Sequence, residues 1–172
     1  WENYPDIIEE GSGNLLPDAT LEKNLLAMGI DANTTVILYQ TNGSDANPIV
    51  ATRFLWALMY AGVKDVRLLN GGINSWIANG FSIDLSAANR NPVNTFGATF
   101  GSHPEYLATT DDVENYIGDA AAVIVDIRSW TEYIGGPNGY LTIGIPLTAV
   151  GRIPGARWGH WGPETLVGGD FW

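Results

Sequence analysis

The chain has 172 residues, of which 45% are hydrophobic and only 16% are charged, so a packed core is possible and general disorder is excluded. Eight lysines and arginines against 19 aspartates and glutamates give a net charge of −11 at pH 7, and such a surface repels phosphate backbones and anionic lipids. We therefore expect neither a nucleic acid nor a membrane as partner.

Cysteine is absent from the sequence, which removes disulfides, thiolate metal sites and cysteine nucleophiles from this chain. The two histidines, His103 and His160, lie in polar or glycine-rich stretches and are expected to be ordinary loop residues. Because a structural zinc site normally needs four Cys or His ligands, we expect no metal. Nothing in the sequence indicates a cofactor.

The first half of the chain alternates short apolar runs with helical patterns. The pattern predicts a loop over 1–19, helices over 21–28, 49–61 and 73–78, and strands buried on both faces over 36–39 and 66–69. Glycines follow each predicted helix, and Asn70-Gly71-Gly72 forms a tight turn. This order of elements is typical of a parallel α/β sheet.

Beyond residue 85 the composition changes. Few apolar residues anchor 86–104, which we interpret as an interdomain linker or a crossing strap. A capped helix over 113–117 and a third buried strand over 120–126 follow, and a Gly/Pro-rich segment extends to Trp172. A domain starting near 105 with one clear strand cannot close a sheet, and strands 36–39 and 66–69 lack flanking partners, so their edges are expected to be open.

The sequence also predicts which tryptophans are buried and whether the chain is part of a larger protein. Trp56 and Trp76 lie among apolar helical neighbours and are expected in the core, whereas Trp158 and Trp161 are expected to be exposed or at a domain interface. The chain starts at Trp1 without an initiator Met and ends at Trp172. We therefore expect a fragment of a larger polypeptide, packed against a second fragment or the rest of a nicked chain.

Two segments carry a family likeness. VILYQTNGSDANPIVATRFLWALMYAGVKDVRLLNGGINSWIANGF resembles the second half of a rhodanese domain, and VIVDIRSWTEYIGG followed by GRIPGARW resembles the opening of the next one. The likeness covers roughly residues 15–160. It is similar to bacterial multi-domain rhodaneses of the thiosulfate or 3-mercaptopyruvate sulfurtransferase type, and DVRLLNGG and IRSWTEY resemble an exported, periplasmic branch.

The resemblance implies a fold class and a domain plan. The fold is α/β, a rhodanese-like parallel sheet flanked by helices, made of one domain's C-terminal half and the next domain's N-terminal half. Residues 1–85 would be a non-catalytic domain whose N-terminal part is missing, residues 86–104 the linker, and residues 105–172 the start of a second domain that lacks its catalytic loop.

The resemblance also implies a persulfide relay, in which a cysteine takes sulfane sulfur from thiosulfate or 3-mercaptopyruvate and passes it to a thiol or cyanide. The residue at the nucleophile position of the first domain is Gln40, which cannot form a persulfide. The cysteine would therefore lie outside this chain, in a remaining fragment or a second chain. The alternative is a catalytically inactive rhodanese module that serves as an interaction scaffold or sulfur-carrier docking platform.

Three residues are candidates for binding an anionic sulfur donor. Asp126 and Arg128 leave the carboxyl end of a predicted strand, where open α/β sheets bind ligands, and Arg128 is the first choice for a carboxylate or thiosulfate. An equally open interpretation is that this pair holds the strand-to-helix turn. Arg152 stands where the family usually has His, in a loop that is as often structural. Glu132 stands where vertebrate-type enzymes carry a second arginine.

Overall fold

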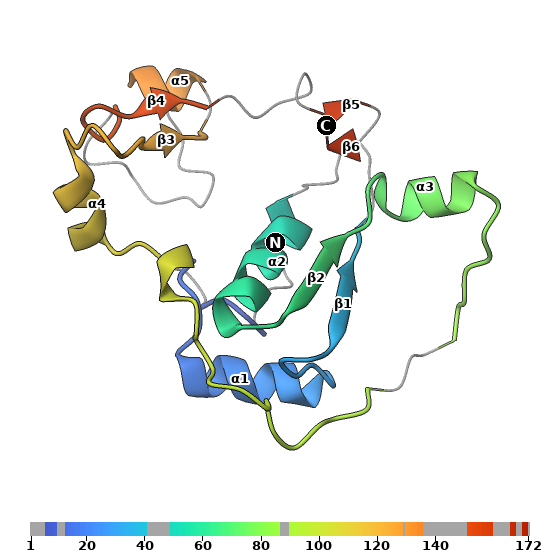
Figure 1. Cartoon of the computed structure of the whole chain (residues 1–172). Helices are drawn as coiled ribbons and strands as arrows, with labels where there is room; N and C mark the ends of the chain where they lie inside the picture. The colour runs from blue at the N-terminus through green and yellow to red at the C-terminus, as the bar shows by residue number, and fades with distance from the viewer. Residues whose placement is uncertain are drawn as a thin grey trace. The chain divides into compact units, whose positions relative to one another are not determined.

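Two parallel strands and the helix between them form the centre of the first half of this computed structural model (Figure 1). Strand β1 (Thr35–Leu38) pairs with β2 (Asp65–Leu68), with Thr35 opposite Asp65 and Leu38 opposite Leu68. Helix α2 (Ile49–Ala61) connects them, within the range that the sequence predicts. Gly62 follows the helix at a φ of 99°, a conformation that glycine adopts without steric cost.

The structure describes residues 6–9, 13–40, 49–86, 90–128, 130–135, 151–159, 166–167 and 170–171. The chain forms two units, one of Trp1–Leu107 with Gly168–Phe171 and the other of Ala108–Val167 with Trp172. The last described elements of the chain are the two-residue strands β5 (Leu166–Val167) and β6 (Asp170–Phe171).

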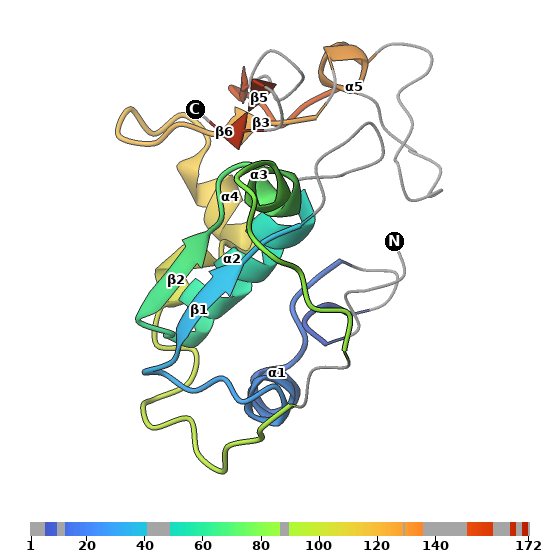
Figure 2. The ribbon, with the colours of Figure 1, turned by 90° about the vertical axis from the view of Figure 1, so that its right-hand side faces the viewer.

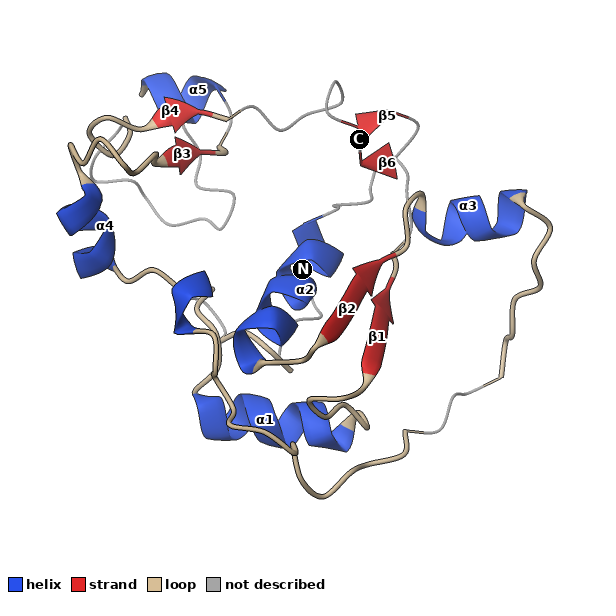
Figure 3. Ribbon diagram, viewed as in Figure 1, coloured by secondary structure: helices blue, strands red, loops and turns tan. Residues whose placement is uncertain are grey.

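The core of the first unit lies between α2 and the N-terminal helix α1 (Asp18–Ala27). Leu21, Leu25 and Leu58 are fully buried there. Burying one such side chain stabilises the fold by about 1.5–3 kcal/mol. The first unit also contains α3 (Gly72–Ala78) and the short 3-10 helix η1 (Pro104–Tyr106), which are coloured with the other helices in Figure 3.

One face of the β1–β2 sheet is open, contrary to the expectation of strands buried on both faces. Burial alternates along β1, and Ile37 and Tyr39 are 58% and 61% exposed. Figure 2 shows α2 behind the two strands, and within the first unit no other described helix covers their opposite face. A strand with one covered face buries every second residue. Among the described residues each strand has a single neighbour, so the sheet edges are open as expected.

Part of the segment expected to be a linker or strap packs on the first unit. Val93 N–H donates to the Leu26 carbonyl at 3.0 Å, and the Phe96 carbonyl accepts from Ala32 N–H at 2.9 Å. Phe96 is only 2% exposed and meets Phe100 edge to face at 4.9 Å between ring centroids. Although the segment is mostly polar in composition, these two rings pack it against the core of the first unit. The contacts are those of a strap, and the division between the units falls after Leu107.

The second unit is built on smaller elements than the sequence predicts. Helix α4 (Thr110–Tyr116) begins with a capping box, in which Thr109 and Asp112 bond to each other's backbone N–H. The expected strand over 120–126 is reduced to β3 (Val125–Asp126), followed by α5 (Trp130–Ile134). The parallel partner of β3 is the strand β4 (Arg157–Trp158), which was not predicted from the sequence. Because so short a pairing buries little surface, Val123 and Val125 are more than half exposed.

Candidate functional site

Gln40 lies just beyond the carboxyl end of β1 and bonds to the first turns of two helices. Its side-chain oxygen accepts a hydrogen bond from Ala51 N–H of α2 at 3.1 Å, and its carbonyl accepts from Ile73 N–H of α3 at 3.0 Å. The first N–H groups of a helix have no partner within the helix, so the Gln40 amide satisfies one of them. Residues 41–48, which follow it, lie outside the described residues.

In the second unit, Asp126 and Arg128 form a close ion pair at the end of β3. Arg128 Nη2 donates to Asp126 Oδ2 at 2.6 Å and Arg128 Nε to Asp126 Oδ1 at 3.0 Å, a two-point contact between guanidinium and carboxylate. The side chain of Arg128 is 32% exposed and that of Asp126 is 9% exposed. The Arg128 hydrogen bonds hold the pKa of Asp126 below its usual value, and the same pairing raises the pKa of Arg128.

The pair also fixes the backbone around it. Asp126 Oδ1 accepts from Arg128 N–H at 3.0 Å, Arg128 Nη2 donates to the Gly151 carbonyl at 2.7 Å, and the Arg128 carbonyl accepts from Trp158 Nε1 at 2.9 Å. Of the two interpretations that the sequence left open, these contacts are the ones expected of a pair that holds the strand-to-helix turn. Binding of an anion by Arg128 stays a prediction.

Arg152 lies in the loop that begins at Gly151, above the ring of Tyr133. The guanidinium carbon is 4.4 Å from the ring centroid, and Nη1 makes a long 3.4 Å hydrogen bond to the Tyr133 carbonyl. The Tyr133 hydroxyl donates to the Ala156 carbonyl at 3.1 Å. Arg152 itself is exposed, and its positive charge is close enough to contribute to the lowered pKa of Asp126. The structure thus brings all three candidate side chains of the second unit into one cluster.

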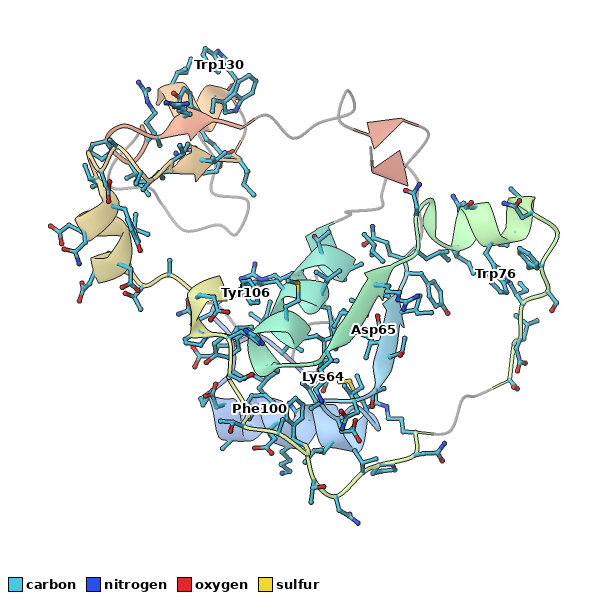
Figure 4. The ribbon with its side chains drawn as sticks, viewed as in Figure 1. Lys64, Asp65, Trp76, Phe100, Tyr106 and Trp130 are labelled. Atoms are coloured by element: carbon cyan, nitrogen blue, oxygen red, sulfur yellow. The ribbon has the colours of Figure 1, made fainter. Side chains whose placement is uncertain are left out.

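Three aromatic rings pack beside this cluster. Trp130 meets Trp158 edge to face at 4.9 Å and Tyr133 at 5.5 Å between centroids. Trp130, labelled in Figure 4, is 52% exposed. The sequence analysis missed Trp130 and Tyr133, although their spacing of three residues at the start of α5 would have placed them on one helix face. Trp158 is half-buried in this cluster, and Trp161 lies outside the described residues.

Trp56, Trp76 and His103 belong to the first unit. Trp56 is half-buried and donates to the Tyr106 carbonyl at 2.5 Å. Trp76, labelled in Figure 4, is 40% exposed, and its ring lies 4.6 Å from the ring of Phe81, so its expected place in the core is wrong. His103 bonds to Glu105 at 2.7 Å, and His160 is not among the described residues.

A metal would need a cluster of suitable ligands. In the ranges given above, the structure contains no group of three or more His, Cys, Asp or Glu side chains that could hold one. Within the same ranges, no helix has the length and apolar character needed to cross a membrane.

Comparison with known proteins agrees with the fold and with the motifs around β1, β2 and β3. Residues 3–79 match the rhodanese-like domain. Over 167 residues the chain is 34% identical to the thiosulfate sulfurtransferase YnjE of Escherichia coli, a match that covers 96% of this chain and 36% of YnjE. The family model and the similar solved structures show that the fold is rhodanese-like and of the α/β class. Residues 3–79 are therefore assigned to the rhodanese-like domain family, and the likeness to the Escherichia coli sulfurtransferase extends over nearly all of the chain.

Further relatives show how much of each protein the similarity covers. The sulfur carrier protein TtuD of Thermus thermophilus is 29% identical, with 92% of this chain and 55% of TtuD covered. The wild-type structure of EanB superposes with a TM-score of 0.81 at 34% identity, over 91% of this chain and 38% of EanB. Another EanB structure shows ergothioneine covalently linked with a cysteine persulfide. The chain spans from about a third to just over half of the length of the curated relatives that it matches.

Proposed function

We propose that this chain is part of a sulfurtransferase whose nucleophile, a cysteine, lies in a remaining fragment or second chain. The observation that carries the proposal is the place of Gln40. It stands at the strand end where the family places its nucleophile, and its side-chain oxygen accepts a hydrogen bond from the first turn of α2. A side chain that is neither thiol nor ionisable cannot take up sulfur. The relatives that support the activity include a thiosulfate sulfurtransferase and a sulfur carrier protein.

The reaction would proceed in two displacements. The cysteine thiolate attacks the sulfane sulfur of thiosulfate, the sulfur–sulfur bond of the donor breaks, and sulfite leaves with the bonding electron pair. An acceptor such as a thiolate or cyanide then attacks the outer sulfur of the persulfide and releases the cysteine thiolate. With 3-mercaptopyruvate as donor, the thiolate attacks the sulfur, the carbon–sulfur bond breaks, and the enolate of pyruvate leaves with the bonding electron pair and is then protonated to pyruvate. The EanB structures support persulfide chemistry on a similar fold.

The role of this chain would be to bind the donor. Arg128, Asp126 and Arg152 gather at the ends of β3 and β4, where the positive charges can hold a small anion. The net charge of −11 over the whole chain disfavours nucleic acid and anionic membrane as partners. A periplasmic location, expected from the resemblance, is part of the same proposal, and cell fractionation of the source organism tests it.

A specific observation also favours a second candidate. Ala51 N–H donates to the neutral amide of Gln40, at the place where an active domain would hold an anionic sulfur. Such a contact is expected of a catalytically inactive module that serves as a scaffold or sulfur-carrier docking platform. The two candidates differ in one assay. The natural polypeptide that contains this chain is supplied with thiosulfate and cyanide, and thiocyanate is measured. Formation of thiocyanate, lost when the proposed cysteine is changed to Ser, supports the enzyme; its absence supports the scaffold.

A further inference from the structure

The two arginines of the second unit differ in how their donors are used. Arg128 directs Nε and Nη2 to Asp126 and also donates from Nη2 to the Gly151 carbonyl, so its charge is neutralised at close range. Among the described residues, Arg152 makes one long hydrogen bond, at 3.4 Å, and its side chain is exposed. An incoming anion would have to replace Asp126 as the hydrogen-bond acceptor of Arg128, whereas Asp126 acts on Arg152 only through its charge.

Stacking leaves the donors of Arg152 available. A guanidinium carries its N–H donors in its own plane, so a ring beneath its face, here Tyr133 at 4.4 Å, leaves the edge free to bind. The ring also restricts the side chain in advance, which reduces the entropy lost on binding. Tyr133 is fixed in turn, because its hydroxyl donates to the Ala156 carbonyl at 3.1 Å.

The loop that carries Arg152 is fixed at both ends. At its start, the Gly151 carbonyl accepts from Arg128. At its end, Ala156 N–H donates to the Ile153 carbonyl at 3.0 Å and Arg157 N–H to the Ile124 carbonyl at 2.9 Å. The backbone of Arg152 is therefore held by the same ion pair that the family motif supplies at Asp126 and Arg128.

We infer that Arg152, oriented by Tyr133, is the group of the second unit that binds a small oxyanion, and that Arg128 is a positioning residue for the Arg152 loop. The inference rests on the proposed function only for the identity of the anion as a sulfur donor. A guanidinium edge fits both the planar carboxylate and the oxygens of thiosulfate. Glu132, whose charge acts on Arg128, opposes anion binding at this cluster.

The test is a titration of the whole 15N-labelled chain with thiosulfate, and separately with pyruvate as a carboxylate, followed through the arginine Nε–H signals. Arg152 should shift with at least one anion, and Arg152→Gln should weaken binding by about tenfold or more, as expected for loss of a charged hydrogen bond. Arg157→Gln, which removes the same charge five residues later, should change affinity less than about twofold. Tyr133→Leu should weaken it by about two- to fivefold, the contribution of an exposed cation–π contact.

Glu132→Gln should tighten binding, because it removes the opposing charge. A shift of Arg128 with none of Arg152, or equal losses for Arg152→Gln and Arg157→Gln, would overturn the inference. Thiosulfate and pyruvate distinguish the two oxyanion classes. Since the readout is binding, it is independent of the thiocyanate assay: loss of binding in Arg152→Gln together with no sulfur transfer by the natural polypeptide would retain the oxyanion site and reject the enzyme.

Discussion

The side-chain oxygen of Gln40 lies 3.1 Å from the backbone nitrogen of Ala51 and accepts its hydrogen bond. This contact joins the end of β1 to the first turn of α2, where a persulfide-forming cysteine of the family would have its sulfur stabilised by helix N–H groups. In this chain the same donor is satisfied by an uncharged amide. The first unit is therefore built as a rhodanese-like framework around a side chain that cannot carry sulfur.

Removing the Gln40 amide should destabilise the first unit. Gln40→Ala leaves an N–H of the α2 first turn without its acceptor, and we expect a loss of about 1 kcal/mol in the free energy of unfolding. Urea denaturation followed by circular dichroism measures it. Gln40→Glu, which keeps an acceptor and adds a favourable charge at the helix N-terminus, is the matched control and should lose nothing. Equal losses in both variants would show that the contact contributes nothing.

The strap formed by residues 90–104 should contribute as much to stability as a core element. Phe96→Ala removes a ring that is 2% exposed, and such truncations typically cost about 3–5 kcal/mol. Phe81→Ala removes a ring of the same kind that is 56% exposed and should cost far less. Thermal unfolding of the two variants compares them directly. Similar melting temperatures would mean that the strap is not part of the fold of the first unit.

The Asp126–Arg128 pair should make stability depend on pH in the acid range. Because the pKa of Asp126 is lowered in the folded chain, its contribution is present above the unfolded-state pKa of about 4 and is lost as the pH falls through the folded-state value. Asp126→Asn should flatten this part of the curve. Asp119→Asn, which changes an exposed carboxylate in the same unit, should leave it unchanged. A profile that Asp126→Asn does not alter would contradict the pair.

A close contact in the second unit explains one glycine. A Cβ on Gly159 would collide with Cγ1 of Val125 on the neighbouring strand, where Gly159 N–H donates to the Asp126 carbonyl at 2.9 Å. Gly159→Ala should therefore cost about 1–3 kcal/mol, typical of overpacking. The double variant Gly159→Ala, Val125→Ala should recover most of this loss. A double-mutant cycle from urea denaturation would refute the contact if the two effects simply add.

The sequence predicted the elements whose signals are local. The apolar helix α2 is followed by Gly62 and has the predicted bounds, and Asn70-Gly71-Gly72 has the residues that a tight turn requires. Burial could not be predicted in the same way, because whether Ile37 faces a covering layer depends on packing elsewhere. The role of Phe96 was concealed in a polar segment, and the stacking of Arg152 on Tyr133 joins residues 19 apart that share no sequence pattern.

The central claim is that this chain supplies the donor-binding part of a sulfurtransferase and another polypeptide segment supplies the cysteine. Denaturing intact-mass analysis of the natively purified protein, before and after thiosulfate, tests it most directly. The account predicts a cysteine-containing species, either a longer polypeptide or a second fragment, that gains the mass of a sulfur atom which dithiothreitol removes. A single 18.5 kDa species, or a cysteine-containing partner that gains no sulfur, would contradict it.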